Sequence, residues 1–165
     1  MDDAFQLIRK HRGNGLLVDT NLLLLYLVGK TNPGRISNFK RTSRYTVEDF
    51  NLLGQTMAQF RTLITTPHVL TELSNLGDLQ GEERLGFRSW FVRTIEQATE
   101  YRDESRLVVK DPSFDRLGLT DAAISALSRH SYLFLTDDLD LYVTLLKRGV
   151  DVVNFGYLQH LRFTL

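Results

Sequence analysis

The stretch YLFLTDDLDLY, from Tyr132 to Tyr142, begins with apolar residues that are typical of a buried strand and then places Asp137, Asp138 and Asp140 in close succession. A helix that follows such a strand needs only one side-chain oxygen to cap its first turn, and a single Asp or Thr136 itself would supply it. The remaining carboxylates therefore need a second explanation, which the rest of the chain has to provide.

The size and composition of the chain exclude several classes of protein. Its 165 residues are enough for a single domain, residues 1–165, that buries a core without disulfides or structural metal. The 20 basic and 20 acidic side chains balance, so a nucleic acid or a membrane would have to meet a local patch of charge. The absence of cysteine excludes a thiol nucleophile and cysteine-ligated zinc or iron–sulfur sites.

The apolar segments of the chain indicate a cytoplasmic protein without a membrane span. The first residues, MDDAFQLIRKHRG, begin with acids and contain no uninterrupted apolar core, so we expect no signal or transit peptide. The most apolar run, GLLVDTNLLLLYLVGK at residues 15–30, is interrupted by Asp19, Thr20 and Asn21 and is too short on either side of them to cross a bilayer. It is typical of a buried strand followed by a helix.

Strand-like runs alternate with helical periodicity along the chain. We expect helices at residues 2–12, 20–28, 46–60, 67–76, 79–101, 119–130 and 138–149, and a short helix at the end. We expect strands at 16–19, 61–66, 106–111, 132–136 and 150–155, and a long loop at 29–45. Thr46 with Asp49 forms a capping-box pattern, and Pro67 and Gly77 bound a helix. The alternation predicts an α/β fold, a three-layer α/β/α sandwich around a central, mostly parallel sheet.

Acidic residues follow four of the expected strands. Ligands of open parallel sheets bind beyond the carboxyl ends of the strands, where the strand-to-helix connections gather. Asp19 ends the first strand, Glu72 lies in the helix after the second, Asp121 begins the helix after the third, and Asp138 with its acidic neighbours follows the fourth. We therefore expect these carboxylates to meet at one edge of the sheet.

Each acid on its own also fits a structural role. Asp is a preferred helix cap, and Glu72 also fits a solvated or ion-paired position on its helix. Taken together, however, several carboxylates within a few ångströms repel one another unless a cation lies among them. Oxygen ligands without cysteine or a histidine pair favour Mg²⁺ or Mn²⁺ over zinc.

Four motifs, LLVDTNLLL, TTPHVLTEL, GLTDAAISALS and LFLTDDLDLY, resemble in this order the four acidic motifs of the PIN domain, a family of metal-dependent nucleases that includes many toxin ribonucleases. The resemblance covers nearly the whole chain. It implies that the acids catalyse and bind metal and that two polar residues support them. The implied acids are Asp19, Glu72, Asp121 and Asp138, with Asp140 as an additional ligand, and the implied supporting residues are Asn21 and Thr136. Asp137 occupies a variable position of the last motif, which favours a plain cap or a solvated charge there.

The implied reaction is phosphodiester hydrolysis in RNA by an endoribonuclease. One or two Mg²⁺ or Mn²⁺ ions held by the four acids would activate water, orient the scissile phosphate and stabilise the leaving oxygen. The resemblance further implies products with a 5′-phosphate and a 3′-hydroxyl. It is compatible with a toxin held by an antitoxin or another inhibitor protein, with an RNA-processing enzyme, with a defence function, and with a homodimer.

The expected loop contains basic residues that an acidic pocket would need around it to attract RNA. Phe39 and Tyr45 of the same segment could stack on unpaired bases, although a solvated, flexible loop explains the segment equally well. We expect His68 and His130 to be structural or exposed, and Trp90 to lie in the core or in a dimer interface. The candidate RNA-binding residues are Lys30, Arg35, Lys40, Arg41 and Arg44.

Other classes of protein with an acidic pocket match this pattern less well. A response-regulator receiver needs its acid pair after the first strand and a Lys after the last, and a haloacid-dehalogenase-like phosphatase needs an Asp where this chain has Asn21. The strongest alternative is a noncatalytic PIN-like module that binds RNA or another protein. Retention of all four motif acids favours an enzyme over this alternative.

Overall fold

The computed structural model describes residues 2–127 and 131–162, and a five-stranded sheet lies at the centre of this part of the chain. The strand order is β3-β2-β1-β4-β5, and every neighbouring pair is parallel. The strands are β1 (Leu16–Val18), β2 (Leu63–Thr65), β3 (Thr99–Glu100), β4 (Leu133–Thr136) and β5 (Val152–Asn154). The predicted α/β class and parallel sheet are confirmed.

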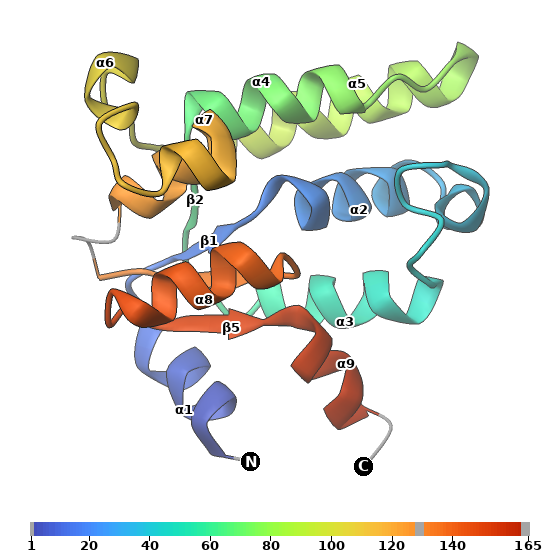
Figure 1. Ribbon diagram of the computed structural model, residues 1–165. Helices are drawn as coiled ribbons and strands as arrows, with labels where there is room; N and C mark the ends of the chain where they lie inside the picture. Colours follow the sequence, from blue (N-terminus) through green and yellow to red (C-terminus); the bar gives the residue numbers. More distant parts are fainter. Residues whose placement is uncertain (1, 128–130, 163–165) are drawn as a thin grey trace.

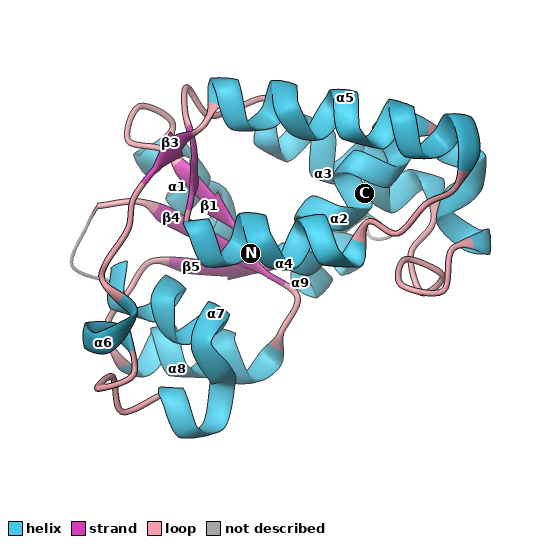
Figure 2. Ribbon diagram, turned by 90° about the horizontal axis from the view of Figure 1, so that it is seen from above, coloured by secondary structure: helices cyan, strands magenta, loops and turns pink. Residues whose placement is uncertain are grey.

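Helices cover both faces of the sheet, which makes the molecule a three-layer α/β/α sandwich. Figure 1 shows α1 and α9 on one side of the strands and α4, α5 and α7 on the other. The view from above places α5 beside the β3 end of the sheet and α7 and α8 beside the β5 end (Figure 2). The helices are α1 (Asp2–His11), α2 (Thr20–Thr31), η1 (Pro33–Asn38, a 3-10 helix), α3 (Val47–Met57), α4 (Pro67–Leu76), α5 (Gly81–Gln97), α6 (Ser105–Val108), α7 (Phe114–Ala126), α8 (Leu139–Lys147) and α9 (Phe155–Arg162).

The two central strands, β1 and β4, are buried along their whole length. Continuous apolar runs are what a parallel strand covered on both faces requires, because neither face of it meets water. The chain builds β1, β2 and β3 outward in one direction and then returns to place β4 on the other side of β1. The topological switch point therefore lies between the carboxyl ends of β1 and β4, which is where ligands of such sheets bind.

Local sequence signals fix the helix ends as predicted. The side chain of Thr46 accepts a hydrogen bond from the Asp49 amide, while the Asp49 side chain accepts one from the Thr46 amide, so the capping box is present. Pro67 is the first residue of α4, and Gly77 follows its last. A final helix, α9, is also present.

The predicted third strand at residues 106–111 is wrong. Residues Ser105–Val108 form the short helix α6, and the third strand is the two-residue β3. Val108 is buried against α7, whereas Leu107 and Val109 on either side of it are exposed. One buried position in this short apolar run is enough for a helical turn, and the exposed Thr–Glu pair of the true edge strand carries no apolar signal.

Several predicted helices have different bounds in the structure, and the one expected at 46–60 ends at Met57. The helix expected at 79–101 ends at Gln97, where the chain turns into β3. The helix expected at 119–130 begins earlier, at Phe114, and bends at Gly118, whose φ of 78° interrupts the helical backbone. The bend makes Asp121 one of the first residues of the straight segment that follows. Residues 128–130, including His130, lie outside the described residues.

The segment at residues 29–45 is not the irregular loop that the sequence predicts. Helix α2 continues to Thr31, and η1 follows, capped by Asn32. Ile36, Phe39 and Tyr45 are buried, and the hydroxyl of Thr42 donates to the carbonyl of Ile36 at 2.8 Å. Apolar residues spaced along the segment tie it to the core, so it is a packed part of the domain.

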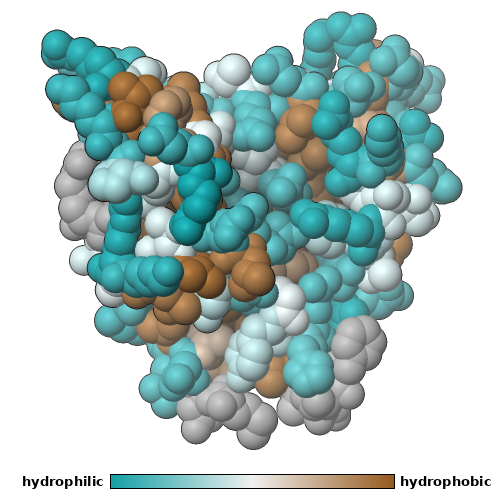
Figure 3. All heavy atoms as spheres, in the orientation of Figure 1, coloured by the Kyte–Doolittle hydropathy of each residue, from teal (hydrophilic) through white to brown (hydrophobic). Residues whose placement is uncertain are grey.

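The surface of the molecule is mainly hydrophilic on the face shown in Figure 3, where hydrophobic residues form several separate groups. Within residues 2–127 and 131–162, no helix is long and apolar enough to cross a membrane.

Two glycines inside helices provide a test of the packing. A Cβ added at Gly29 of α2 would lie 2.3 Å from Cδ2 of Phe50, whereas one added at Gly54 of α3 would meet its nearest atom, Cε2 of Tyr26, at 4.0 Å. Gly29→Ala should lower the free energy of unfolding by roughly 1–3 kcal/mol, because the Phe50 ring must move. Gly54→Ala should raise it by up to about 1 kcal/mol, since Ala favours the helix. Urea unfolding of both variants measures the two effects, and equal changes would contradict the packing described.

Candidate active site

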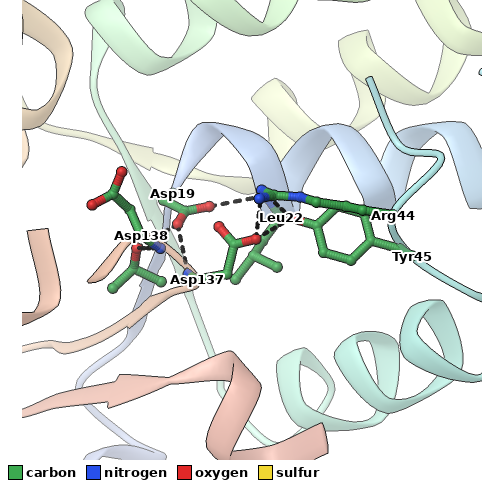
Figure 4. Close-up of polar contacts among 7 residues, drawn as sticks. Asp19, Leu22, Arg44, Tyr45, Asp137 and Asp138 are labelled. Carbon is green, nitrogen blue, oxygen red and sulfur yellow. Dashed lines mark hydrogen bonds and ion pairs between the residues drawn. The ribbon is translucent and has the colours of Figure 1, made fainter. Parts of the chain in front are cut away.

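Asp19 joins the two central strands at their carboxyl ends. Its Oδ1 accepts a hydrogen bond from the Leu22 amide at 2.9 Å and so caps α2. Its Oδ2 accepts from the Thr136 hydroxyl and, at 3.0 Å, from the Asp137 amide (Figure 4). Only 4% of the residue is exposed. The capping role is therefore real, and it holds the carboxylate at the switch point.

Thr136 and Asp138 shape the turn after β4. The Thr136 hydroxyl, which donates to Asp19, also accepts from the Asp138 amide at 2.9 Å. The Asp138 side chain accepts from the Leu141 amide at 2.9 Å and caps α8. The cap of this helix is thus Asp138 rather than Asp137. A carboxylate carries about four lone-pair sites, so the capping bond leaves Asp138 with acceptors that can still bind a ligand.

Asp137 is neither a cap nor a solvated charge, and this part of the sequence interpretation is wrong. Its Oδ2 accepts from Nη2 of Arg44 at 2.7 Å and from the Tyr45 hydroxyl, and the side chain is only 11% exposed (Figure 4). Its Oδ1 is buried and has no hydrogen-bond partner in the described part of the chain. A buried carboxylate oxygen without a partner beside Asp19 is the kind of atom that a bound cation would satisfy.

A second group of acids comes from two helices and from the turn before a third. Asp121 of α7 lies near Glu72 of α4 and Asp138, and the charges of both act on it. Burial, followed by repulsion from these two carboxylates, raises the pKa of Asp121 to about 7. No hydrogen bond or ion pair to the Asp121 side chain is found among residues 2–127 and 131–162. Three carboxylates thus lie close enough for their charges to interact, and Asp121 has no positively charged partner among the described residues.

The same effect acts on the first pair of acids. Burial and, after it, the negative charge of Asp137 raise the pKa of Asp19 to about 7, against the three hydrogen bonds that Asp19 accepts. Burial and the hydrogen bond to Asp137 raise the pKa of Tyr45, so its phenol stays protonated and acts as a donor. The electrostatic cost at Asp19 and Asp121 is what a divalent cation would remove.

Glu72 is held by a residue that the sequence interpretation missed. The Thr20 hydroxyl donates to Oε2 of Glu72 at 3.2 Å and so links the first turn of α2 to α4. Asn21, expected to support Asp19, has an exposed side chain that makes no hydrogen bond found among the described residues. Asp140 is likewise exposed, and its backbone carbonyl accepts a hydrogen bond from the Thr144 hydroxyl at 2.7 Å. Thr20, which was not predicted, therefore supports one of the predicted acids, Glu72.

The carboxylate oxygens are suitable ligands for a hard divalent cation, although the acids do not form one tight cluster. In the described ranges, no group of three Asp, Glu or His side chains is arranged to hold a metal ion. The charge of Asp19 interacts with that of Asp137, which was not predicted as a ligand, whereas Asp121 interacts with Glu72 and Asp138. Both groups offer only oxygen donors, and the partnerless Oδ1 of Asp137 adds one that the sequence had not assigned.

The basic side chains of residues 30–45 mostly have partners. Arg35 pairs with Glu83 at 3.2 Å, Arg41 with Asp78 at 3.7 Å, and Lys30 lies 4.4 Å from the ring centroid of Trp90. Lys40 is exposed. Phe39 and Tyr45 are buried, so they are not placed to stack on bases as predicted. Of this set, Arg44 alone is seen in contact with the acidic edge, through Asp137.

The histidine expected to be structural lies near the site without joining it. Nε2 of His68 is 3.2 Å from the Ser105 hydroxyl, which ties α4 to α6. His68, Glu72 and Thr120 line a cavity of about 440 Å³ between α4 and α7. Open space therefore adjoins the carboxylate edge.

The chain was also compared with known proteins. No protein-family model matches it, and neither does any curated protein sequence. The resemblance to PIN domains thus rests on the four sequence motifs alone.

Proposed function

We propose that this protein is a metal-dependent nuclease that hydrolyses phosphodiester bonds in RNA. The observation that carries the proposal is the meeting of Glu72 of α4, Asp121 of α7 and Asp138 of the turn before α8, with no cationic partner on Asp121 in the described chain. Such an arrangement is costly in a folded protein and is typical of sites that bind a cation. It lies at the carboxyl edge of a parallel sheet, where α/β proteins bind ligands.

The chain's own residues would hold the site in place. Thr136 and the Asp137 amide fix the Asp19 carboxylate, the Leu141 amide orients Asp138, and Thr20 holds Glu72. Mg²⁺ or Mn²⁺ held by Asp19, Glu72, Asp121 and Asp138, with Asp137 as a further donor, would supply the charge that makes water nucleophilic and stabilises the leaving oxygen. Hydrogen bonds from neighbouring groups to ligating carboxylates are what keep such sites rigid.

Arg44 gives the acidic edge a contact for the substrate's phosphates. One of its nitrogens, Nη2, contacts both Asp137 and the Tyr45 hydroxyl, and the side chain remains 58% exposed. A guanidinium has five N–H donors in a planar fork, so donors are left for a phosphate oxygen. The buried Tyr45 and Asp137 hold this cation beside the carboxylates instead of leaving it free in solution.

Loss of one carboxylate should abolish catalysis without damaging the fold. Asp121→Asn removes a charge at nearly constant volume, and no hydrogen bond to Asp121 in the described chain is lost with it. We expect an end-labelled RNA of mixed sequence to be cut by the wild type with Mn²⁺, and cutting by the variant to fall at least about 100-fold. EDTA should stop the wild-type reaction.

The matched control is Asp115→Asn, an exposed acid on the first turn of the same helix, which should cut as the wild type does. Full activity of Asp121→Asn would show that the assigned site is wrong. No cutting by the wild type with any RNA, together with metal-independent RNA binding, would favour the noncatalytic module.

The raised pKa of Asp121 predicts how stability depends on pH. A carboxyl whose pKa is about 7 in the folded state binds more protons folded than unfolded between about pH 4 and 7. The free energy of unfolding of the metal-free wild type should therefore fall as pH rises through this range. Asp121→Asn removes this loss, so at pH 8 its melting temperature should exceed that of the wild type by on the order of 5 °C, with little difference at pH 4.

Added metal should reverse the order of the two melting temperatures. At pH 8 in EDTA the variant should be the more stable protein, and added Mn²⁺ should raise the melting temperature of the wild type more than that of Asp121→Asn. Scanning fluorimetry with Asp115→Asn alongside measures both. A variant that is less stable than the wild type at pH 8 in EDTA would show that Asp121 has a stabilising partner.

Arg44→Ala tests the role of the cation at the site. Loss of the guanidinium should weaken RNA binding and slow cleavage about tenfold or more, because a phosphate then meets the acids without a nearby donor. Arg9→Ala, an exposed cation on α1, should change neither quantity. Filter binding in Ca²⁺ and cleavage in Mn²⁺ measure the two effects. Faster cleavage by Arg44→Ala would mean that the Arg44–Asp137 ion pair blocks the site.

A further inference from the structure

A second candidate ligand site lies at the opposite edge of the sheet from the carboxylates. A cavity of about 230 Å³ opens at the amino-terminal ends of β1 and β2, beside the end of α3 and along α5. Leu16 and Leu63, the first residues of the two strands, form part of its wall. Nothing in the proposed nuclease reaction uses this edge, so the cavity needs its own explanation.

The cavity is basic. Arg61 and Arg93 line it, and no acidic residue does so among the residues that the structure describes. Neither arginine makes an ion pair found in residues 2–127 or 131–162, although Arg35, Arg41 and Arg148 elsewhere each pair with an acid. A protein with equal numbers of acids and bases has therefore left two guanidinium groups at one hollow without a carboxylate.

The ring of Trp90 orients Arg93, one of the two arginines of the cavity, and also contacts Lys30, which lies outside the lining. Cζ of Arg93 lies 4.8 Å from the ring centroid of Trp90, and Nζ of Lys30 lies 4.4 Å from the same centroid. A ring face attracts the charge of a guanidinium but uses few of its N–H donors, so Arg93 is oriented and still able to donate. Arg93 is therefore oriented so that it can bind a negatively charged group.

The other walls are partly aromatic and partly polar, the polar part coming from Thr62, Thr94 and Gln97. Tyr26, Phe60 and Trp90 contribute aromatic surface, and Gly54 contributes no side chain. The volume is below the roughly 300–1,000 Å³ of cavities that enclose drug-sized ligands, so the ligand is small or extends partly into solvent.

We propose that this cavity binds a small aromatic anion, that is, a planar ring carrying a phosphate or a carboxylate. The anionic group contacts Arg61 and Arg93, and the ring lies among Tyr26, Phe60 and Trp90. The site is a function additional to the proposed nuclease and does not depend on it.

The experiment uses Trp90, which is the single tryptophan of the chain and lines the cavity. Its fluorescence, excited at 295 nm in EDTA, is followed while uridine 5′-monophosphate is added, with free N-acetyltryptophanamide as the correction for absorbed light. We expect a saturable change with a Kd on the order of 0.1–1 mM. Uridine and inorganic phosphate should each bind at least about tenfold more weakly, and benzoate shows whether a carboxylate replaces the phosphate. No saturable change with either aromatic anion, or equal binding of uridine and its monophosphate, would overturn the proposal.

Variants locate the binding. Arg61→Ala, which leaves the Trp90 environment intact, should weaken binding of the monophosphate at least about tenfold, and Gly54→Leu should block it by filling the cavity. Arg88→Ala, on an exposed position of α5, should bind as the wild type does. Circular dichroism checks that the variants fold. Wild-type affinity in both Arg61→Ala and Gly54→Leu would refute the site.

The nuclease variant separates the two proposals. Asp121→Asn should bind the monophosphate with wild-type affinity in EDTA, because Asp121 lies at the other edge of the sheet. Failure of RNA cleavage would leave this binding unchanged. Loss of binding in Asp121→Asn would place the ligand at the carboxylate edge and would overturn the cavity proposal.

Discussion

The hydrogen bonds that the Asp19 carboxylate accepts from Thr136 and from the Asp137 amide hold the molecule together at its switch point. They connect the end of β1 to the end of β4, two strands that adjoin in the sheet but are more than a hundred residues apart in the chain. The same carboxylate caps α2. Because Asp19 is buried, its charge is tolerated only through these donors, and the turn after β4 is in turn shaped around it. The positions of Asp137 and Asp138 follow from this one interaction.

The candidate site therefore uses groups that also have structural tasks. Asp19 and Asp138 cap the two helices that leave the switch point, and helix caps are fixed by short, directional bonds to backbone amides. A carboxylate placed in this way presents its remaining lone pairs in a defined direction, which a metal ligand needs. Asp121 differs, because no bond to it is found within the described residues and both burial and neighbouring charges oppose its ionisation. Asp19 and Asp138 thus also cap helices, whereas no structural bond of Asp121 is found in the described chain.

Signals within a few residues made much of the fold predictable. The capping box at Thr46 and the bounds of α4 need only local contacts to form, and the continuous apolar runs of β1 and β4 are visible in the sequence itself. The third strand failed because β3 is an exposed edge strand of two residues that exists only by pairing with β2. The edge at which the acids gather followed from topology, but the role of Asp137 did not. Its partners, Arg44 and Tyr45, lie more than ninety residues earlier, in a segment whose packing the sequence does not reveal.

The overall charge of zero conceals an uneven distribution along the sheet. Among the described residues, five carboxylates gather at the carboxyl edge of the sheet with Arg44 in contact with one of them, while the amino ends of β1 and β2 border a hollow lined by two arginines and no acid. Within each group the like charges repel one another. The neutral total charge does not relieve this repulsion, because charges at opposite edges of a domain are screened from each other beyond about 10 Å. The charge of each group must therefore be compensated by an opposite charge at the same edge. A cation at the first and an anion at the second would provide it, and for this reason the two proposed ligands carry opposite charge.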